Sequence, residues 1–105
     1  MSSNYKVKFT LIADKDIDNI FLYIFNELKA PMAAENLLNE IEQKIKKIAD
    51  MPYSCPLVDD KFLREKGYRK LVVKNYIALY VVSDDEKLVK IMRVIYGASD
   101  YEQNI

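Results

Sequence analysis

The strongest constraint on this sequence is a pair of amphipathic stretches joined by almost no chain. In residues 14–29 the apolar side chains recur three or four positions apart, as on one face of a helix: Ile17, Ile20, Phe21, Ile24, Phe25 and Leu28. A second apolar stripe follows Pro31: Ala34, Leu37, Leu38, Ile41, Ile45 and Ile48. Proline suits the first turn of a helix, and Met51-Pro52 ends the second one. Because so few residues separate the two helices, we expect an antiparallel hairpin with both stripes on one side.

The chain on either side of this hairpin has the period of two that is typical of β-strands. An alternating segment at 5–11 precedes the hairpin, and three segments rich in Val, Ile and Tyr follow it, at 68–74, 76–82 and 87–96. Residues 52–67 predict a loop. The order β-α-α-β-β-β predicts a two-layer α+β domain, in which the helical hairpin packs on an antiparallel β-meander and the N-terminal strand pairs at one side of it.

Local signals add detail to this single domain, which we expect to span residues 1–105. Asp14 is the expected N-cap of the first helix. Lys74-Asn75 predicts a tight turn, because Asn tolerates a positive φ. Tyr76 and Tyr80 share one face of a strand and are expected to pack in the core.

Composition excludes several classes of function. Sixteen basic residues balance sixteen acidic ones, so net charge does not favour sequence-independent nucleic-acid binding. The chain has no histidine, which excludes His-containing zinc sites and Ser-His-Asp catalysis. The single Cys55 has no partner for an internal disulfide, and no apolar run approaches the length of a membrane span. We therefore expect no metal, no cofactor, no membrane contact and a cytoplasmic location.

Charge is unevenly spread along the chain. Residues 14–42 carry seven acidic residues against two lysines, and residues 61–74 carry six basic residues against Glu65. Such runs usually form solvated surfaces. The alternative is that the basic stretch docks a polyanion or an acidic partner segment.

The C-terminal half contains a more specific succession of motifs. Three hydrophobic segments follow one another and close at Asp100-Tyr101: Tyr68-Arg69-Lys70-Leu71-Val72-Val73, then Asn75-Tyr76-Ile77-Ala78-Leu79-Tyr80, then Val89-Lys90-Ile91-Met92-Arg93-Val94-Ile95-Tyr96-Gly97. Together with the strand and helical hairpin before them, they make the whole chain resemble toxins of the RelE/ParE superfamily, the toxic halves of type II toxin–antitoxin pairs.

This resemblance implies a fold, a partner and two alternative activities. RelE-like members enter the ribosome and cut messenger RNA, whereas ParE-like members inhibit DNA gyrase by binding it. Both are neutralised by a cognate antitoxin, a segment of which wraps the toxin. The sheet face that the helices leave uncovered could serve as an antitoxin groove or as the contact of a homodimer.

The resemblance also implies site residues. Arg69 matches the arginine of the family's Arg-x-Leu strand, which binds the scissile phosphate in RNA-cutting relatives. The alternative is a surface cation that pairs with Asp84 or with an antitoxin carboxylate. Arg93 interrupts an apolar strand and would hold phosphate, and Tyr101 would transfer a proton. These three residues are candidates for catalysis only if the protein cleaves messenger RNA.

Four more residues are candidates for binding RNA or a protein partner. Lys66, Lys70 and Lys74 could line the same groove as Arg69, although lysines are also common on strand edges, where they discourage aggregation. Tyr96 could be a stacking platform or part of the rim of the core.

The sequence departs from the family pattern at one point. Before the final acidic residue the family frequently places basic residues, but here the stretch reads Ala98-Ser99. This departure weakens the nuclease interpretation, and the long paired helices together with the poor set of proton-transfer groups favour a ParE-like toxin that acts by binding. A RelE-like ribosome-dependent endonuclease is the second interpretation, and a non-toxic antitoxin-binding relative is the third.

Overall fold

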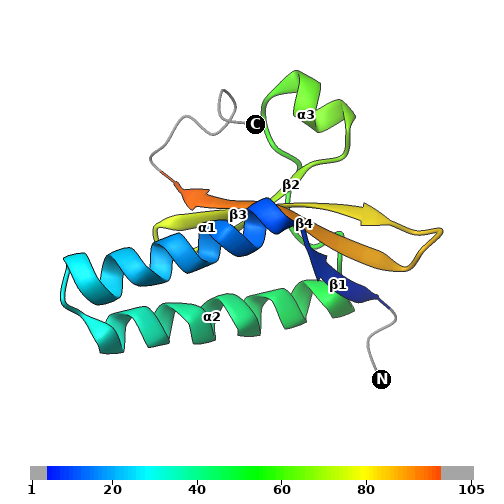
Figure 1. Cartoon of the computed structure of the whole chain (residues 1–105). Helices are drawn as coiled ribbons and strands as arrows, with labels where there is room; N and C mark the ends of the chain where they lie inside the picture. The colour runs from blue at the N-terminus through cyan, green and yellow to red at the C-terminus, as the bar shows by residue number, and fades with distance from the viewer. Residues whose placement is uncertain (1–4, 98–105) are drawn as a thin grey trace.

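A four-stranded sheet with a helical hairpin across one face makes up the domain (Figure 1). The structure, a computed structural model, describes residues 5–97. Its elements follow in this order: β1 (Lys6–Phe9), α1 (Leu11–Leu22), a π-helical turn η1 (Tyr23–Glu27), α2 (Pro31–Asp50), α3 (Lys61–Glu65), β2 (Arg69–Val73), β3 (Tyr76–Ser83) and β4 (Leu88–Tyr96). The spatial order of the strands is β1-β4-β3-β2. β1 runs parallel to β4 and the other pairs are antiparallel, so the predicted fold class is confirmed.

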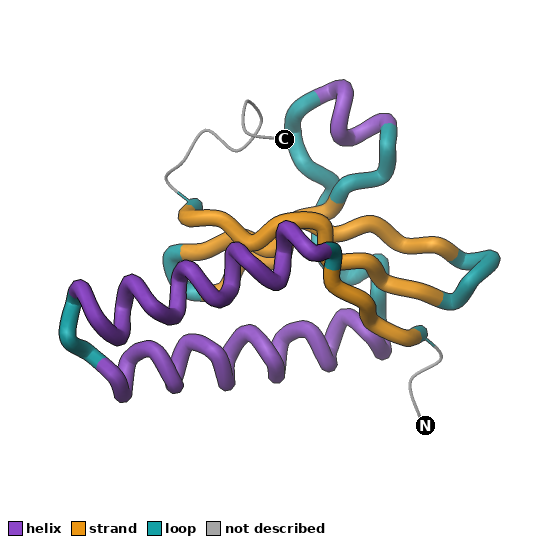
Figure 2. Tube along the Cα trace, viewed as in Figure 1, coloured by secondary structure: helices purple, strands orange, loops and turns teal. Residues whose placement is uncertain are grey.

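The predicted helical hairpin is confirmed, with α1 and α2 lying side by side on the same face of the sheet (Figure 2). The prediction of Asp14 as N-cap was wrong. The helix begins earlier, because the Thr10 hydroxyl accepts a hydrogen bond from the Ala13 N–H at 3.0 Å. Asp14 instead lies in the first turn, where a negative charge is favoured by the helix dipole.

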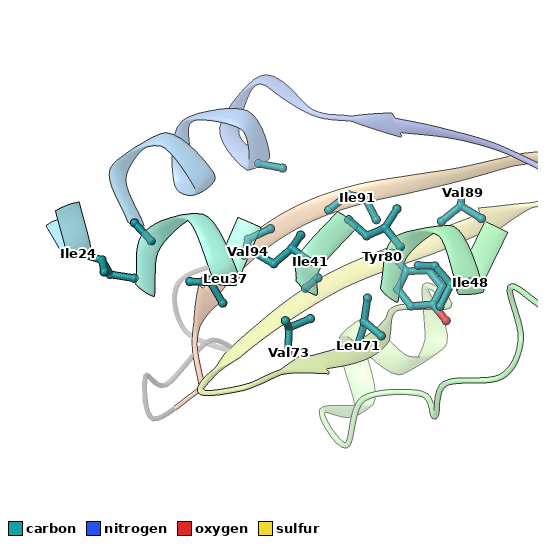
Figure 3. Close-up of a cluster of buried hydrophobic side chains, with 14 residues drawn as sticks. Ile24, Leu37, Ile41, Ile48, Leu71, Val73, Tyr80, Val89, Ile91 and Val94 are labelled. Carbon is teal, nitrogen blue, oxygen red and sulfur yellow. The ribbon is translucent and has the colours of Figure 1, made fainter. Parts of the chain in front are cut away.

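The main core fills the space between the hairpin and the sheet (Figure 3). It contains the predicted stripe of α2, except Leu38, together with alternating residues of the strands: Leu37, Ile41, Ile45, Ile48, Leu71, Val73, Tyr80, Val89, Ile91 and Val94. Tyr80 is completely buried and Tyr76 packs against the cluster, so the expected core role of both tyrosines is confirmed.

A smaller apolar cluster lies on the opposite face of the sheet. We call this face, which packs against α3, the α3 face, and we call the face beneath α1 and α2 the hairpin face. The smaller cluster consists of Val58, Leu63, Leu79 and Ile95. The first two come from the segment predicted as a loop, which includes the short helix α3. Asp60 caps this helix by accepting a hydrogen bond from the Leu63 N–H at 2.9 Å.

Two irregularities shape the strands. Lys74, not the expected Asn75, takes the positive φ (54°) in the turn between β2 and β3. In β4 an extra residue interrupts the pairing with β3, because Leu79 lies opposite Arg93 while Tyr80 lies opposite Ile91. Such a bulge reverses which side chains face each side of the sheet.

The buried hydroxyl of Tyr80 yields a stability prediction. It donates a hydrogen bond of 2.8 Å to the carbonyl oxygen of Pro52. The substitution Tyr80→Phe leaves that carbonyl without its partner and should lower the free energy of unfolding by about 1–3 kcal/mol in urea denaturation. The matched control is Tyr23→Phe, at a side chain that is 54% exposed, and it should change the value by less than about 0.5 kcal/mol. Equal losses in both variants would contradict the prediction.

Candidate functional site

The two arginines expected to share a catalytic site lie on opposite faces of the sheet. Arg69 pairs across the strands with Tyr80, a residue of the main core beneath the hairpin. Arg93 pairs with Leu79, which belongs to the smaller cluster on the α3 face. Directly opposite residues of neighbouring strands point to the same face. The two guanidinium groups therefore do not converge on one phosphate.

Arg69 is held by the segment that follows α2. Its Nη1 donates a hydrogen bond of 2.6 Å to the carbonyl oxygen of Cys55. Its guanidinium also lies over the Tyr53 ring, 4.9 Å from the centroid. The expected alternative partner, Asp84, binds the hydroxyl of that same tyrosine at 2.7 Å. Tyr53 therefore links Arg69 and Asp84, because its ring contacts the guanidinium group and its hydroxyl binds the carboxylate.

The carboxylate of Asp84 binds the hydroxyl groups of two tyrosines. One carboxylate oxygen, Oδ1, accepts hydrogen bonds of 2.7 Å from the hydroxyls of both Tyr5 and Tyr53. These hydrogen bonds lower the pKa of Asp84. The bond to Asp84 raises the pKa of Tyr5 to about 12 and also raises the pKa of Tyr53. Both phenols are therefore held in the protonated form, which makes them poor general bases.

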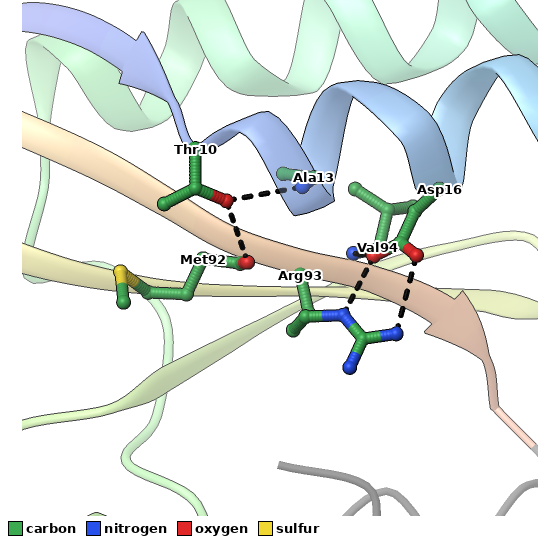
Figure 4. Close-up of polar contacts among 6 residues, drawn as sticks. All are labelled: Thr10, Ala13, Asp16, Met92, Arg93 and Val94. Carbon is green, nitrogen blue, oxygen red and sulfur yellow. Dashed lines mark hydrogen bonds and ion pairs between the residues drawn. The ribbon is translucent and has the colours of Figure 1, made fainter.

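Arg93 forms an ion pair with α1 (Figure 4). Its Nε and Nη2 donate hydrogen bonds to the two carboxylate oxygens of Asp16, at 2.8 and 3.2 Å. Asp16 Oδ2 also accepts a hydrogen bond of 3.0 Å from the backbone N–H of Val94. The hydrogen bond to Asp16 raises the pKa of Arg93. The sequence does not indicate Asp16 as the partner of Arg93, because the two residues are 77 positions apart.

The lysines of the basic stretch are distributed over different parts of the surface. Leu79 of β3 lies between Lys70 of β2 and Arg93 of β4, so the side chains of these two cations start from the same face of the sheet, the α3 face. Lys66 lies over the exposed Phe62 ring, 4.3 Å from its centroid. Lys74 lies in the turn at the far end of β2. The basic stretch 61–74 therefore does not form a single groove around Arg69.

Tyr96 is half-exposed on the hairpin face of the sheet. Its ring meets that of Tyr76 edge-on, with 5.7 Å between the centroids. Tyr101, the remaining candidate for catalysis, lies outside the described residues, as do Ala98 and Ser99.

A cleft of about 640 Å³ opens beside Tyr96, between α1 and the end of β4. One wall of the cleft is a single face of α1 and η1, whose lining residues recur every three or four positions. The lining residues are Asp16, Asn19, Ile20, Tyr23, Leu28, Asn75, Tyr76, Val94, Ile95 and Tyr96. Of these residues, the sequence indicates only Tyr96 as a binding candidate. The cleft suits an uncharged group with an apolar side chain, since the carboxylate of Asp16 is already paired.

Residues 5–97 contain no cluster of metal-ligating side chains and no helix that could span a membrane. No group of three or more His, Cys, Asp or Glu side chains in this part of the chain could hold a metal ion. Among its helices, none has the length and apolar character to cross a bilayer.

Comparison with known proteins identifies relatives of this arrangement. The family model for the ParE toxin of the type II toxin–antitoxin system parDE matches residues 7–101. A chain of the chromosomal ParDE system from P. aeruginosa superimposes with a TM-score of 0.71 at 21% identity, covering 90% of this chain and 98% of that one. No curated protein sequence matches.

Two further structures share the fold. A chain of the toxin–antitoxin complex RelBE2 from Mycobacterium tuberculosis has a TM-score of 0.61 at 19% identity, covering 88% of this chain and 96% of that one. A chain of the DinJ-YafQ toxin–antitoxin complex from E. coli has a TM-score of 0.56 at 18% identity, covering 93% and 98%.

The ion pair between α1 and β4 predicts an energetic coupling. Asp16→Asn should lower the free energy of unfolding by about 1.5–3 kcal/mol, because it removes the charge from hydrogen bonds that are mostly shielded from water. A double-mutant cycle with Arg93→Met should give a coupling energy of at least about 0.5 kcal/mol in urea denaturation. Asp18→Asn, at an exposed position of the same helix, is the control and should have little effect. A coupling energy near zero would show that the pair is not structural.

Because the Tyr5 hydroxyl binds the carboxylate of Asp84, we expect Tyr5 to lose its proton at a higher pH than an ordinary tyrosine. The folded-state pKa of about 12 exceeds the ordinary value of 10.0. The stabilising contribution of Tyr5 is therefore fully present below pH 10 and is lost as the pH rises towards 12. Asp84→Ala should return the Tyr5 pKa towards 10.0, as measured by NMR of the ring, and Asp85→Ala should leave it raised. An unchanged titration in Asp84→Ala would contradict this assignment.

Proposed function

The chain belongs to the ParE toxin family of type II toxin–antitoxin systems, and from this premise we propose that it arrests growth by binding a cellular protein target, DNA gyrase being the one that its family implies. It acts in the cytoplasm and is neutralised by a cognate antitoxin. This activity needs a stable, specific surface and no proton-transfer chemistry of its own.

The separation of Arg69 and Arg93 is the observation that carries this proposal. Cleavage of RNA requires cations that stabilise the charge on one phosphorane and groups that move protons to and from it. Here the two arginines lie on opposite faces, and both are engaged in contacts within the domain. The chain also has no histidine, and the described phenols with a shifted pKa, Tyr80 included, all have it raised. These features support binding over cleavage.

A RelE-like endonuclease is the second candidate, and one specific observation favours it. Lys70 and Arg93 lie on either side of Leu79 on the α3 face, so two cationic side chains start from the same face of the sheet. In this alternative Tyr101 would serve as the proton-transfer group. The third candidate, a non-toxic relative that binds antitoxin, predicts no growth arrest at all.

Induced expression in a bacterial host separates the candidates. We expect growth arrest with filamentous cells and DNA-damage signalling, while messenger RNA stays intact in primer-extension assays. The purified protein should inhibit supercoiling by gyrase, and the antitoxin should restore it. Arrest of translation with trimmed messages would contradict the proposal, and unimpaired growth would favour the non-toxic relative.

The endonuclease alternative predicts its own mutational pattern. If messages are cut, Lys70→Ala should reduce cleavage about tenfold or more, since a charge-assisted contact to phosphate is lost. Lys15→Ala, at an exposed position of α1, is the control. Gyrase inhibition that is equal in the two variants supports the binding mechanism.

A further inference from the structure

The last third of β4 has no neighbouring strand on the side that faces α1. β1 ends at Phe9, which pairs with Ile91, and the chain then enters α1. Beyond this point two side chains, and not a strand, form hydrogen bonds with the outward backbone groups of β4. The Thr10 hydroxyl donates to the Met92 carbonyl oxygen at 2.9 Å, and the Asp16 carboxylate accepts from the Val94 N–H at 3.0 Å (Figure 4).

The direction of the remaining backbone groups follows from alternation along the strand. The Val94 N–H points to Asp16, away from β3, whereas the Gly97 N–H donates to the Asn75 carbonyl oxygen at 2.7 Å. Alternate residues of an antiparallel strand direct both backbone groups to the same side. The N–H and C=O of Tyr96 and the C=O of Val94 therefore point away from β3. No strand within residues 5–97 covers them.

The cleft beside α1 lies directly along this open edge. Val94, Ile95 and Tyr96 form one wall, and Ile20 and Tyr23 lie in the opposite wall. About half of the Tyr23 and Tyr96 surfaces is exposed, at 54% and 49%. Because Arg93 already neutralises the one carboxylate of the lining, charge complementarity favours an uncharged occupant.

The other two edges of the sheet are less suited to accept a strand. The outer edge of β1 is four residues long and carries Lys6 and Lys8, which disfavour strand addition. The outer edge of β2 is already occupied. Leu57 forms a bridge with Arg69, and the Lys44 ammonium group donates to the Val72 carbonyl oxygen at 3.2 Å.

We propose that the antitoxin adds a short extended strand to β4 at Val94–Tyr96 and places an apolar side chain in the cleft between this edge and α1. The backbone groups of Tyr96 supply the hydrogen bonds, and the aromatic walls select the side chain. Asp16 limits the added strand to a few residues, so the strand anchors a larger interface. This inference rests on the proposed function, which supplies the partner.

Amide hydrogen exchange resolved by NMR tests the added strand. The full chain is measured alone and in complex with the antitoxin encoded by the neighbouring reading frame. The Tyr96 amide should exchange rapidly in the free protein and at least about tenfold more slowly in the complex. The Val94 amide, which is already bonded to Asp16, serves as the internal control and should be protected in both states.

The possible outcomes separate this inference from the proposed function. A complex in which the Tyr96 amide stays unprotected overturns the strand and leaves the toxin–antitoxin pairing intact. New protection confined to Val7 and Phe9, whose amides face outward from β1, means that the antitoxin uses the other edge and also overturns it. The absence of a complex with the antitoxin overturns both the inference and the proposed partner.

Two pairs of variants provide an independent measurement. Tyr96→Pro removes the outward N–H and should weaken antitoxin binding about fivefold more than Tyr96→Ala, which keeps it. Asn19→Lys puts a charge into the cleft from α1 and should weaken binding, whereas Asn39→Lys, at an exposed position of α2, should not. Equal affinities within each pair would overturn the proposal.

Discussion

The carboxylate of Asp16 is the contact on which the arrangement of this domain depends. Hydrophobic burial between the hairpin and the sheet supplies most of the driving force, but it has no direction. Asp16 supplies direction, because it binds the side chain of Arg93 and the backbone of Val94 at the same time. With the Thr10 hydroxyl it fixes α1 along β4 and satisfies part of an edge that β1 is too short to cover.

The bulge at Met92 determines where the chemistry of β4 is presented. Val89 and Ile91 face the main core, and regular alternation would direct Arg93 to that same face, together with Arg69. The extra residue shifts the alternation by one position. Arg93 therefore lies opposite Leu79 on the α3 face, and Val94 returns to the core. One inserted residue thus separates the two arginines that the family resemblance brings together.

Sequence periodicity was sufficient to predict the hairpin, the four strands and the edge position of the first strand. It was insufficient where a contact between distant residues decides the outcome. Thr10 continues the alternation of the strand, yet its hydroxyl caps a helix and also binds the carbonyl oxygen of Met92, which is distant in the sequence. Lys74 takes the positive φ that the turn needs, although asparagine tolerates a positive φ more readily than lysine. Arg93 occupies a position where alternation from Val89 and Ile91 predicts a core residue, but the nearly continuous apolar run at 88–96 does not locate the extra residue, so the separation of the arginines could not be predicted.

The distribution of charge has a consequence for recognition. The basic stretch 61–74 is divided between α3, the α3 face of the sheet, the hairpin face and the far turn, so its cations do not act as one patch. Long-range attraction between a divided charge and a partner is weak at physiological salt, because screening operates over about 8 Å. Specific recognition must then come from short-range features that are built into the fold. The open end of β4 offers such features, since its backbone groups have fixed directions and its cleft has fixed aromatic walls.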